Sequence, residues 1–153
     1  MSQDLHAADI LAIQGNLSLF GRALDLQDWE AVASTFVEGA TIDYDSMQTF
    51  QNGVPDFLAR LQEVFSQLAY TQHLIGSMYV TLDGDRGHCA SSVQATHVGH
   101  AGQYFTTGGR YEDDVVRTEG GWKMSVRRFR RQFGFDPSGF GTSLGVSNLS
   151  VGA

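Results

Sequence analysis

The chain has 153 residues, of which 42% are hydrophobic and 18% are charged, a composition typical of one globular domain and not of a disordered segment. Its net charge of −7 argues against a nucleic-acid partner and against an anionic membrane surface. The single cysteine, Cys89, excludes an internal disulfide and a metal site built on several thiolates.

The first half of the chain predicts three helices and one strand. The first helix is indicated by apolar residues at three- and four-residue steps, namely Ile10, Ile13, Leu17, Phe20 and Leu24. A short helix is predicted over residues 28–36 with Asp28 as its N-cap, and a strand follows over residues 40–47. Residues 52–68 predict a third helix, because an apolar stripe follows a proline in the first turn.

The second half changes to the two-residue period of β-strands. Four strands are predicted, over residues 70–82, 88–100, 103–118 and 121–135. The segments between them, such as "DGDRG" and "EGG", have turn chemistry, so the strands form an antiparallel meander. Helices packed on one face of a curved sheet make an α+β domain, which we assign to residues 1–135. The glycine- and serine-rich tail, residues 136–153, is either disordered or lies over an opening as a lid.

Two histidines on predicted strands are candidates for chemistry. His73 shares a strand face with Ile75, Ser77 and Tyr79 by alternation. His97 lies on the next strand, on a face of small and mostly apolar residues, namely Cys89, Ser91, Val93 and Ala95. One histidine on such a face is more often structural than catalytic, but the small neighbours leave room for a cavity that both imidazoles could line.

Asp25 and Tyr44 are further candidates. Asp25 ends the first helix at the edge of its apolar stripe, where it is either solvated or turned inward to orient a histidine base. Tyr44 follows Ile42 in the first strand, and its phenol is either a core side chain or a donor to a substrate carbonyl.

The last strand carries the basic run "SVRRFRRQF". Alternation places Arg127, Phe129, Arg131 and Phe133 on one side of it. A solvated or subunit-facing surface is the favoured interpretation, because the net charge opposes a nucleic-acid interface, and Arg127 is the best candidate to face inward.

Three further expectations concern what the sequence does not contain. A His/Glu cluster at helical spacing is absent, so no metal site is predicted. No apolar run approaches the ~20 residues that a membrane span needs, so no membrane partner is predicted. The N-terminus has no signal-peptide pattern, and we therefore expect a cytoplasmic protein.

The order of elements resembles the cone-shaped fold of the nuclear-transport-factor-2-like superfamily. This resemblance implies an α+β barrel, in which a curved mixed or antiparallel sheet packs against three N-terminal helices. Within it, the closest resemblance is to the SnoaL-like and scytalone-dehydratase-like branch, which also contains hexachlorocyclohexane dehydrochlorinase. The matching segments are "ALDLQDWEAVASTFVEGATIDYDS", "TQHLIG", "THV" and "EGGWKMSVRR", and together they span most of residues 7–133.

The resemblance implies roles for five residues. In the two lyases of this branch, an aspartate at the end of the first helix pairs with the histidine of the "QH" strand, and these positions are Asp25 and His73. A tyrosine and a second strand histidine of the dehydratase correspond to Tyr44 and His97. An arginine in the last strand of the dehydrochlorinase corresponds best to Arg127.

The chain also departs from the dehydratase. A second tyrosine of that enzyme is Leu24 here, and its asparagine is replaced near Arg110 or Tyr111, so the substrate of the dehydratase is not carried over. Together with Arg127, Tyr111 and Phe129 are predicted to contact the substrate.

These patterns predict a cofactor-independent lyase of dehydratase type, acting on a hydroxylated cyclic or polyketide-like small molecule. His73 would remove a C–H proton and Asp25 would orient it, so no cofactor is needed. An isomerase or a polyketide cyclase with the same base is the near alternative, and a non-catalytic binding module or structural subunit of the same fold is a second class. The resemblance also implies a homo-oligomer, either a dimer or a trimer.

Overall fold

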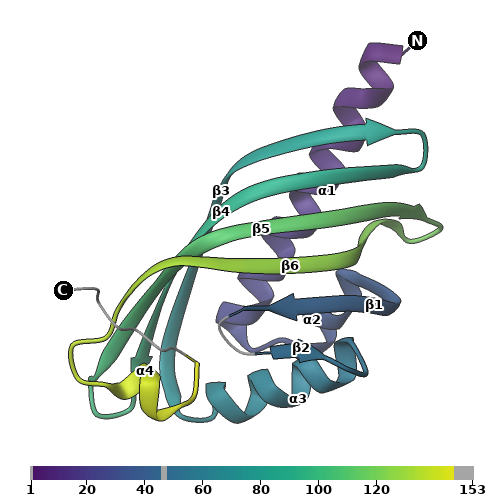
Figure 1. The fold of residues 1–153 in the computed structure, drawn as a ribbon. Helices are drawn as coiled ribbons and strands as arrows, with labels where there is room; N and C mark the ends of the chain where they lie inside the picture. Colours follow the sequence, from purple (N-terminus) through teal and green to yellow (C-terminus); the bar gives the residue numbers. More distant parts are fainter. Residues whose placement is uncertain (1, 46–47, 147–153) are drawn as a thin grey trace.

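The computed structural model describes residues 2–45 and 48–146 (Figure 1). In chain order its elements are α1 (Ser2–Leu26), α2 (Trp29–Ser34), β1 (Phe36–Tyr44), β2 (Gln48–Phe50), α3 (Val54–Phe65), β3 (Leu68–Asp83), β4 (Arg86–Gly99), β5 (Tyr104–Thr118), β6 (Gly121–Phe135) and α4 (Phe140–Ser143). The three predicted N-terminal helices and four predicted long strands are all present. None of the described helices is long and apolar enough to cross a membrane.

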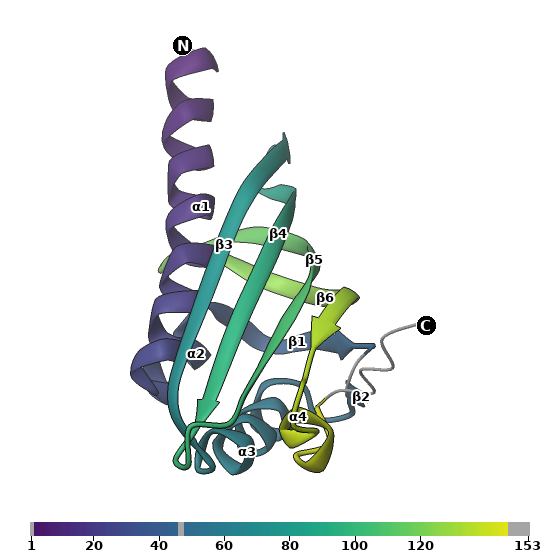
Figure 2. The same ribbon diagram turned by 90° about the vertical axis from the view of Figure 1, so that its left-hand side faces the viewer.

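The six strands form one curved, open sheet in the order β2-β1-β6-β5-β4-β3. Strands β3 to β6 make the predicted antiparallel meander. Strand β1 pairs parallel to β6, and the short strand β2, which was not predicted, pairs antiparallel to β1. Figure 2 shows the sheet curving above α3, with α1 running beside β3. The predicted α+β fold is confirmed.

The core lies between the inner face of the sheet and helices α1 and α3. From α1, Ile13, Leu17 and Phe20 are fully buried, as the helical period predicts. Phe57 of α3 is also fully buried and stacks on Phe20, with ring centroids 6.4 Å apart. The Asp28 side chain caps α2 by accepting a hydrogen bond from the N–H of Ala31.

A bulge in β3 changes the predicted strand face. The register with β4 shifts between Gly76 and Tyr79, and Ser77 has a positive φ of 49°. As a result Tyr79 is 72% exposed, and the inward positions beyond the bulge are those of Met78 and Val80. The prediction that His73 shares its face with Ser77 and Tyr79 was wrong, because simple alternation does not include an extra residue.

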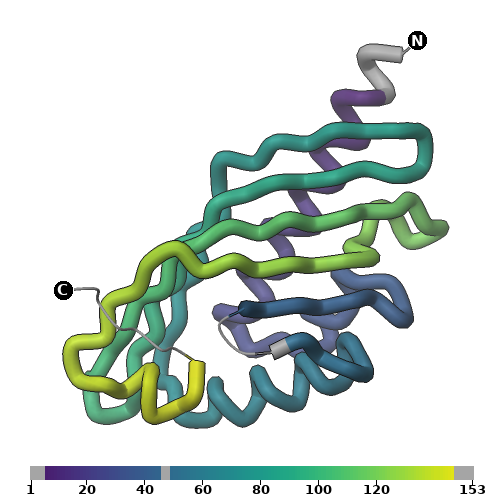
Figure 3. The backbone as a smooth tube through the Cα atoms, viewed as in Figure 1, coloured from purple at the N-terminus to yellow at the C-terminus, as the bar shows by residue number. Residues whose placement is uncertain are grey.

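The segment after β6 turns back toward α3 (Figure 3). Its short helix α4 places the ring of Phe140 6.1 Å from that of Phe105 in β5. The guanidinium of Arg60 in α3 donates to the carbonyl oxygen of Leu144 at 2.6 Å. Residues 136–146 are thus packed onto the domain, while the rest of the predicted tail lies outside the described residues.

Candidate active site

A mostly apolar cavity of about 80 Å³ lies between α1, α3 and the inner face of the sheet. It is lined by Leu24, Tyr44, Phe57, Leu61, Val64, Phe65, His73, Val93, Ala95, His97, Phe105, Thr107, Tyr111, Phe129 and Val146. Five of the predicted site residues are therefore in its wall. The polar groups in this wall come from two histidines, two tyrosines and one threonine.

Asp25 and His73 are in direct contact at this wall. The Oδ1 atom of Asp25 lies 2.7 Å from Nδ1 of His73, and its Oδ2 atom accepts a hydrogen bond of 3.0 Å from the main-chain N–H of His73. Thr71 adds a third hydrogen bond, from its hydroxyl to Oδ1 at 2.9 Å. Because Nδ1 faces a carboxylate, Nε2 is the imidazole nitrogen left for other partners.

The local folding explains this contact. Asp25 lies in the last turn of α1, which packs along β3, and β3 is one of the two edge strands of the sheet. An edge strand has main-chain N–H groups without a strand partner, and Asp25 accepts one of them. Burial acts to raise the pKa of the Asp25 carboxyl, but the hydrogen bonds from His73 and Thr71 outweigh it and hold this pKa below its ordinary value.

His97 lies next to His73 and is neutral at pH 7. The two imidazole centroids are 5.5 Å apart, and the ring of His97 stacks on Phe105 at 4.3 Å. Burial, with a further contribution from His73, lowers the pKa of His97 to about 3. Its Nδ1 atom has no hydrogen-bond partner among the described residues. His97 can therefore serve a ligand as a neutral hydrogen-bonding group.

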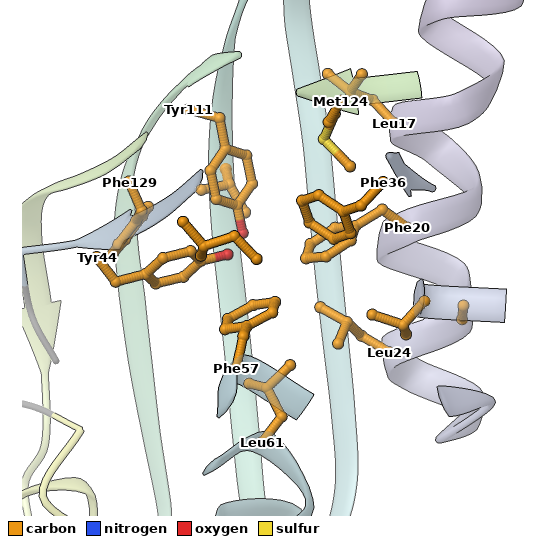
Figure 4. Close-up of a cluster of buried hydrophobic side chains, with 14 of the residues drawn as sticks. Leu17, Phe20, Leu24, Phe36, Tyr44, Phe57, Leu61, Tyr111, Met124 and Phe129 are labelled. Carbon is orange, nitrogen blue, oxygen red and sulfur yellow. The ribbon is translucent and has the colours of Figure 1, made fainter. Parts of the chain in front are cut away.

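Two tyrosines form another polar part of the wall. The hydroxyl groups of Tyr44 and Tyr111 point toward one another above Phe57 (Figure 4), and their ring centroids are 6.2 Å apart. Phe129 packs against both rings. Burial raises the pKa of both phenols, so they stay protonated and can donate hydrogen bonds.

A profile of the SnoaL-like domain family matches residues 5–128. The chain belongs to the SnoaL-like domain family. This assignment and the structural neighbours confirm the resemblance that the sequence motifs indicated.

Three solved structures are similar to this SnoaL-like chain. A candidate aromatic ring hydroxylase of Novosphingobium aromaticivorans is 29% identical with a TM-score of 0.77, covering 83% of this chain and 91% of its own. A candidate scytalone dehydratase of the same species is 22% identical with a TM-score of 0.80, covering 87% and 90%. Hexachlorocyclohexane dehydrochlorinase type 3 of Novosphingobium barchaimii is 19% identical with a TM-score of 0.77, covering 90% and 96%. The last two establish similarity of fold.

Arg127 faces inward in this SnoaL-like chain but does not line the cavity. Its guanidinium is fully buried and donates two hydrogen bonds, of 2.8 and 2.7 Å, to the buried carboxylate of Asp113. It also lies between the rings of Phe20 and Tyr111, 4.1 and 3.8 Å from their centroids. Burial acts to lower the pKa of Arg127, but Asp113 raises it, so the guanidinium stays charged. Tyr111 separates this charge from the cavity.

Sequence reasoning did not single out four residues of this region: Thr71, Phe105, Thr107 and Asp113. Two of them could have been predicted from strand alternation. Thr71 lies two positions before His73, and Asp113 lies two positions after Tyr111, so each pair shares a strand face. For Phe105 and Thr107 the decisive information was the strand pairing of β5 with β4.

Across residues 2–45 and 48–146, no group of three or more His, Cys, Asp or Glu side chains is placed to hold a metal ion.

Proposed function

We propose that this protein is a cofactor-independent lyase of dehydratase type, which removes water from a hydroxylated cyclic or polyketide-like small molecule. The observation that carries the proposal is the 2.7 Å contact between Asp25 and His73 at the wall of an apolar cavity. A base held by a carboxylate and facing an apolar space is the arrangement of general-base catalysis. The apolar lining suits an uncharged ring system.

Proton removal is the first step of the proposed reaction. Asp25 accepts the Nδ1–H of His73, so Nε2 is free to take a proton from a carbon next to a substrate carbonyl. The carbonyl oxygen gains negative charge as this C–H bond breaks. The hydroxyl groups of Tyr44 and Tyr111 are the donors that we assign to this oxygen. Asp25 stabilises the imidazolium that forms.

The leaving hydroxyl then needs a proton. His97, with a pKa of about 3, is not protonated at pH 7, and both tyrosines have raised pKa values. The His73 imidazolium formed in the first step holds the proton taken from the carbon, so it returns this proton to the departing oxygen as the C–O bond breaks. Neutral His97 hydrogen-bonds the hydroxyl. We therefore expect the proton and the hydroxyl to leave from the same face of the substrate.

The first prediction concerns turnover of candidate substrates. The protein is incubated in D₂O with a panel of cyclic β-hydroxy ketones. We expect it to convert at least one of them into a conjugated ketone, because loss of water creates a C=C bond next to the carbonyl. The conjugated product is detected by its ultraviolet absorbance. Recovered substrate is expected to carry deuterium on the carbon next to the carbonyl. Deuterium uptake with a product of unchanged composition would instead identify an isomerase. Ligands that bind without either change would contradict catalysis and favour a binding module.

We also propose that residues 140–146 act as a lid. Val146 lines the cavity, and the hydrogen bond from Arg60 to Leu144 holds this segment against α3. A cavity of about 150 Å³ accommodates benzene, whereas this one has about 80 Å³. A cyclic substrate therefore requires part of the wall to move, and residues 140–146 lie outside the hydrogen-bonded sheet.

Arg60→Ala is expected to speed dissociation of a bound ligand about tenfold, because the charged hydrogen bond to the Leu144 carbonyl is lost. Stopped-flow measurement of the dissociation rate checks this. Glu63→Ala is the matched control, since it breaks only the exposed ion pair that Glu63 makes with Arg60. Equal dissociation rates in Arg60→Ala and the parent protein would refute the lid.

Self-association stays a prediction. The described residues include large apolar side chains exposed on β3 and β6, namely Leu74, Phe133 and Phe135. Exposed apolar groups of this size are suited to a contact between subunits, which supports the expected homo-oligomer.

A further inference from the structure

Thr71 is hydrogen-bonded to the carboxylate that pairs with His73. Its hydroxyl donates to Oδ1 of Asp25 at 2.9 Å, and this is the same oxygen that lies 2.7 Å from Nδ1 of His73. The other oxygen, Oδ2, accepts from the main-chain N–H of His73 at 3.0 Å. Both oxygens of the carboxylate are thus held by one strand, at positions 71 and 73. Thr71 itself does not line the cavity.

The spacing of these donors follows from strand geometry. Side chains two residues apart point to the same face of a strand, so Thr71 and His73 both face the end of α1. Asp25 reaches this edge from the helix, and its carboxylate is free to rotate about its terminal torsion unless several donors fix it. The side chain of Asp25 is 24% exposed, so water competes for its oxygens.

We propose that Thr71 is a positioning residue for proton transfer, whose hydroxyl holds the Asp25 carboxylate in the orientation that accepts the Nδ1–H of His73. This inference rests on the proposed function, because it concerns the same base. Without the hydroxyl, the donors left to Asp25 among the described residues come from His73 itself, and the carboxylate can turn toward water. The imidazole then loses its fixed partner, and Nε2 is no longer held at one angle to the substrate.

The acidity of Asp25 supports this assignment. Burial acts to raise its pKa, whereas the hydrogen bonds from His73 and, to a smaller extent, from Thr71 lower it. A donor that stabilises the ionised carboxylate keeps Asp25 negatively charged, and this negative charge stabilises the His73 imidazolium. The threonine therefore contributes to both the orientation and the charge of Asp25.

The test compares Thr71→Val, which removes the hydroxyl and keeps the branched shape, with Thr71→Ser, which keeps the hydroxyl. We expect Thr71→Val to lower kcat on the order of tenfold with little change in KM, and Thr71→Ser to restore it. Thr81→Val is the control, because Thr81 is an exposed threonine on the same strand. A Thr71→Val protein that melts earlier but keeps the parent kcat would show a purely structural role and overturn the proposal.

A second readout does not depend on turnover. We expect NMR titration of the Asp25 carboxyl carbon to show a higher pKa in Thr71→Val than in the parent. We also expect the His73 Nδ1–H resonance to weaken through exchange with water. Thr71→Ser is expected to retain both parent signals. If the parent converts no substrate, the proposed function fails. Positioning by Thr71 is refuted by a different result, namely an unchanged Asp25 pKa and an unchanged His73 Nδ1–H resonance in Thr71→Val.

Discussion

His73→Ala is expected to lower kcat by about 10²–10⁴-fold, the usual contribution of a general base. Asp25→Asn is expected to lower it by at least about 10²-fold, because an amide cannot stabilise the imidazolium as a carboxylate does. Both proteins should stay folded. In His73→Ala the Asp25 carboxylate keeps the Thr71 hydroxyl and the main-chain N–H as donors, so no buried charge is left without a partner. Initial rates and far-ultraviolet circular dichroism measure the two properties.

His88→Ala is the matched control for this experiment. His88 also pairs with an aspartate through Nδ1, at 2.9 Å from Asp114, but it lies outside the cavity wall. We expect it to keep the parent kcat. Retained turnover in both His73→Ala and Asp25→Asn, on a substrate that the parent converts, would rule out the dyad as the base.

The fold was predictable wherever a local period decided the structure. The helical stripe from Ile13 to Leu24 and the change to a two-residue period after Leu68 fixed the helices and the meander. The parallel pairing of β1 with β6 was not predicted, because it joins segments about 85 residues apart and depends on packing. The bulge at Ser77 was missed for a related reason, since a register shift leaves little trace in a hydrophobic pattern.

The candidate site was predictable in part. The pairing of Asp25 with His73 was expected from the family motifs, and the structure contains the contact. Their catalytic roles stay predictions. That His97 is neutral could not be read from the sequence, because its pKa depends on burial against Phe105 and on the nearby imidazole of His73. Arg127 was expected to contact the substrate, whereas its nearest groups are Asp113 and two aromatic rings.

The buried pair of Arg127 and Asp113 leads to the largest expected effect on stability. Asp113→Ala is expected to lower the free energy of unfolding by about 3–5 kcal/mol, because it leaves a buried guanidinium without its counter-charge. Replacing both partners by apolar residues, as in Arg127→Met with Asp113→Leu, is expected to recover most of this loss. Urea unfolding curves give these values. Asp43→Ala, which breaks the exposed pair with Arg130, is the control and is expected to cost at most about 1 kcal/mol.

The double variant also separates folding from chemistry. The guanidinium of Arg127 lies 3.8 Å from the centroid of the Tyr111 ring, and its charge acts to lower the pKa of that phenol against the effect of burial. Without the charge, Tyr111 is a weaker donor to an oxygen that becomes negative in the transition state. We therefore expect the double variant to regain stability but to keep a kcat about tenfold below that of the parent. Parent-like turnover in a stable double variant would show that Arg127 serves the core alone.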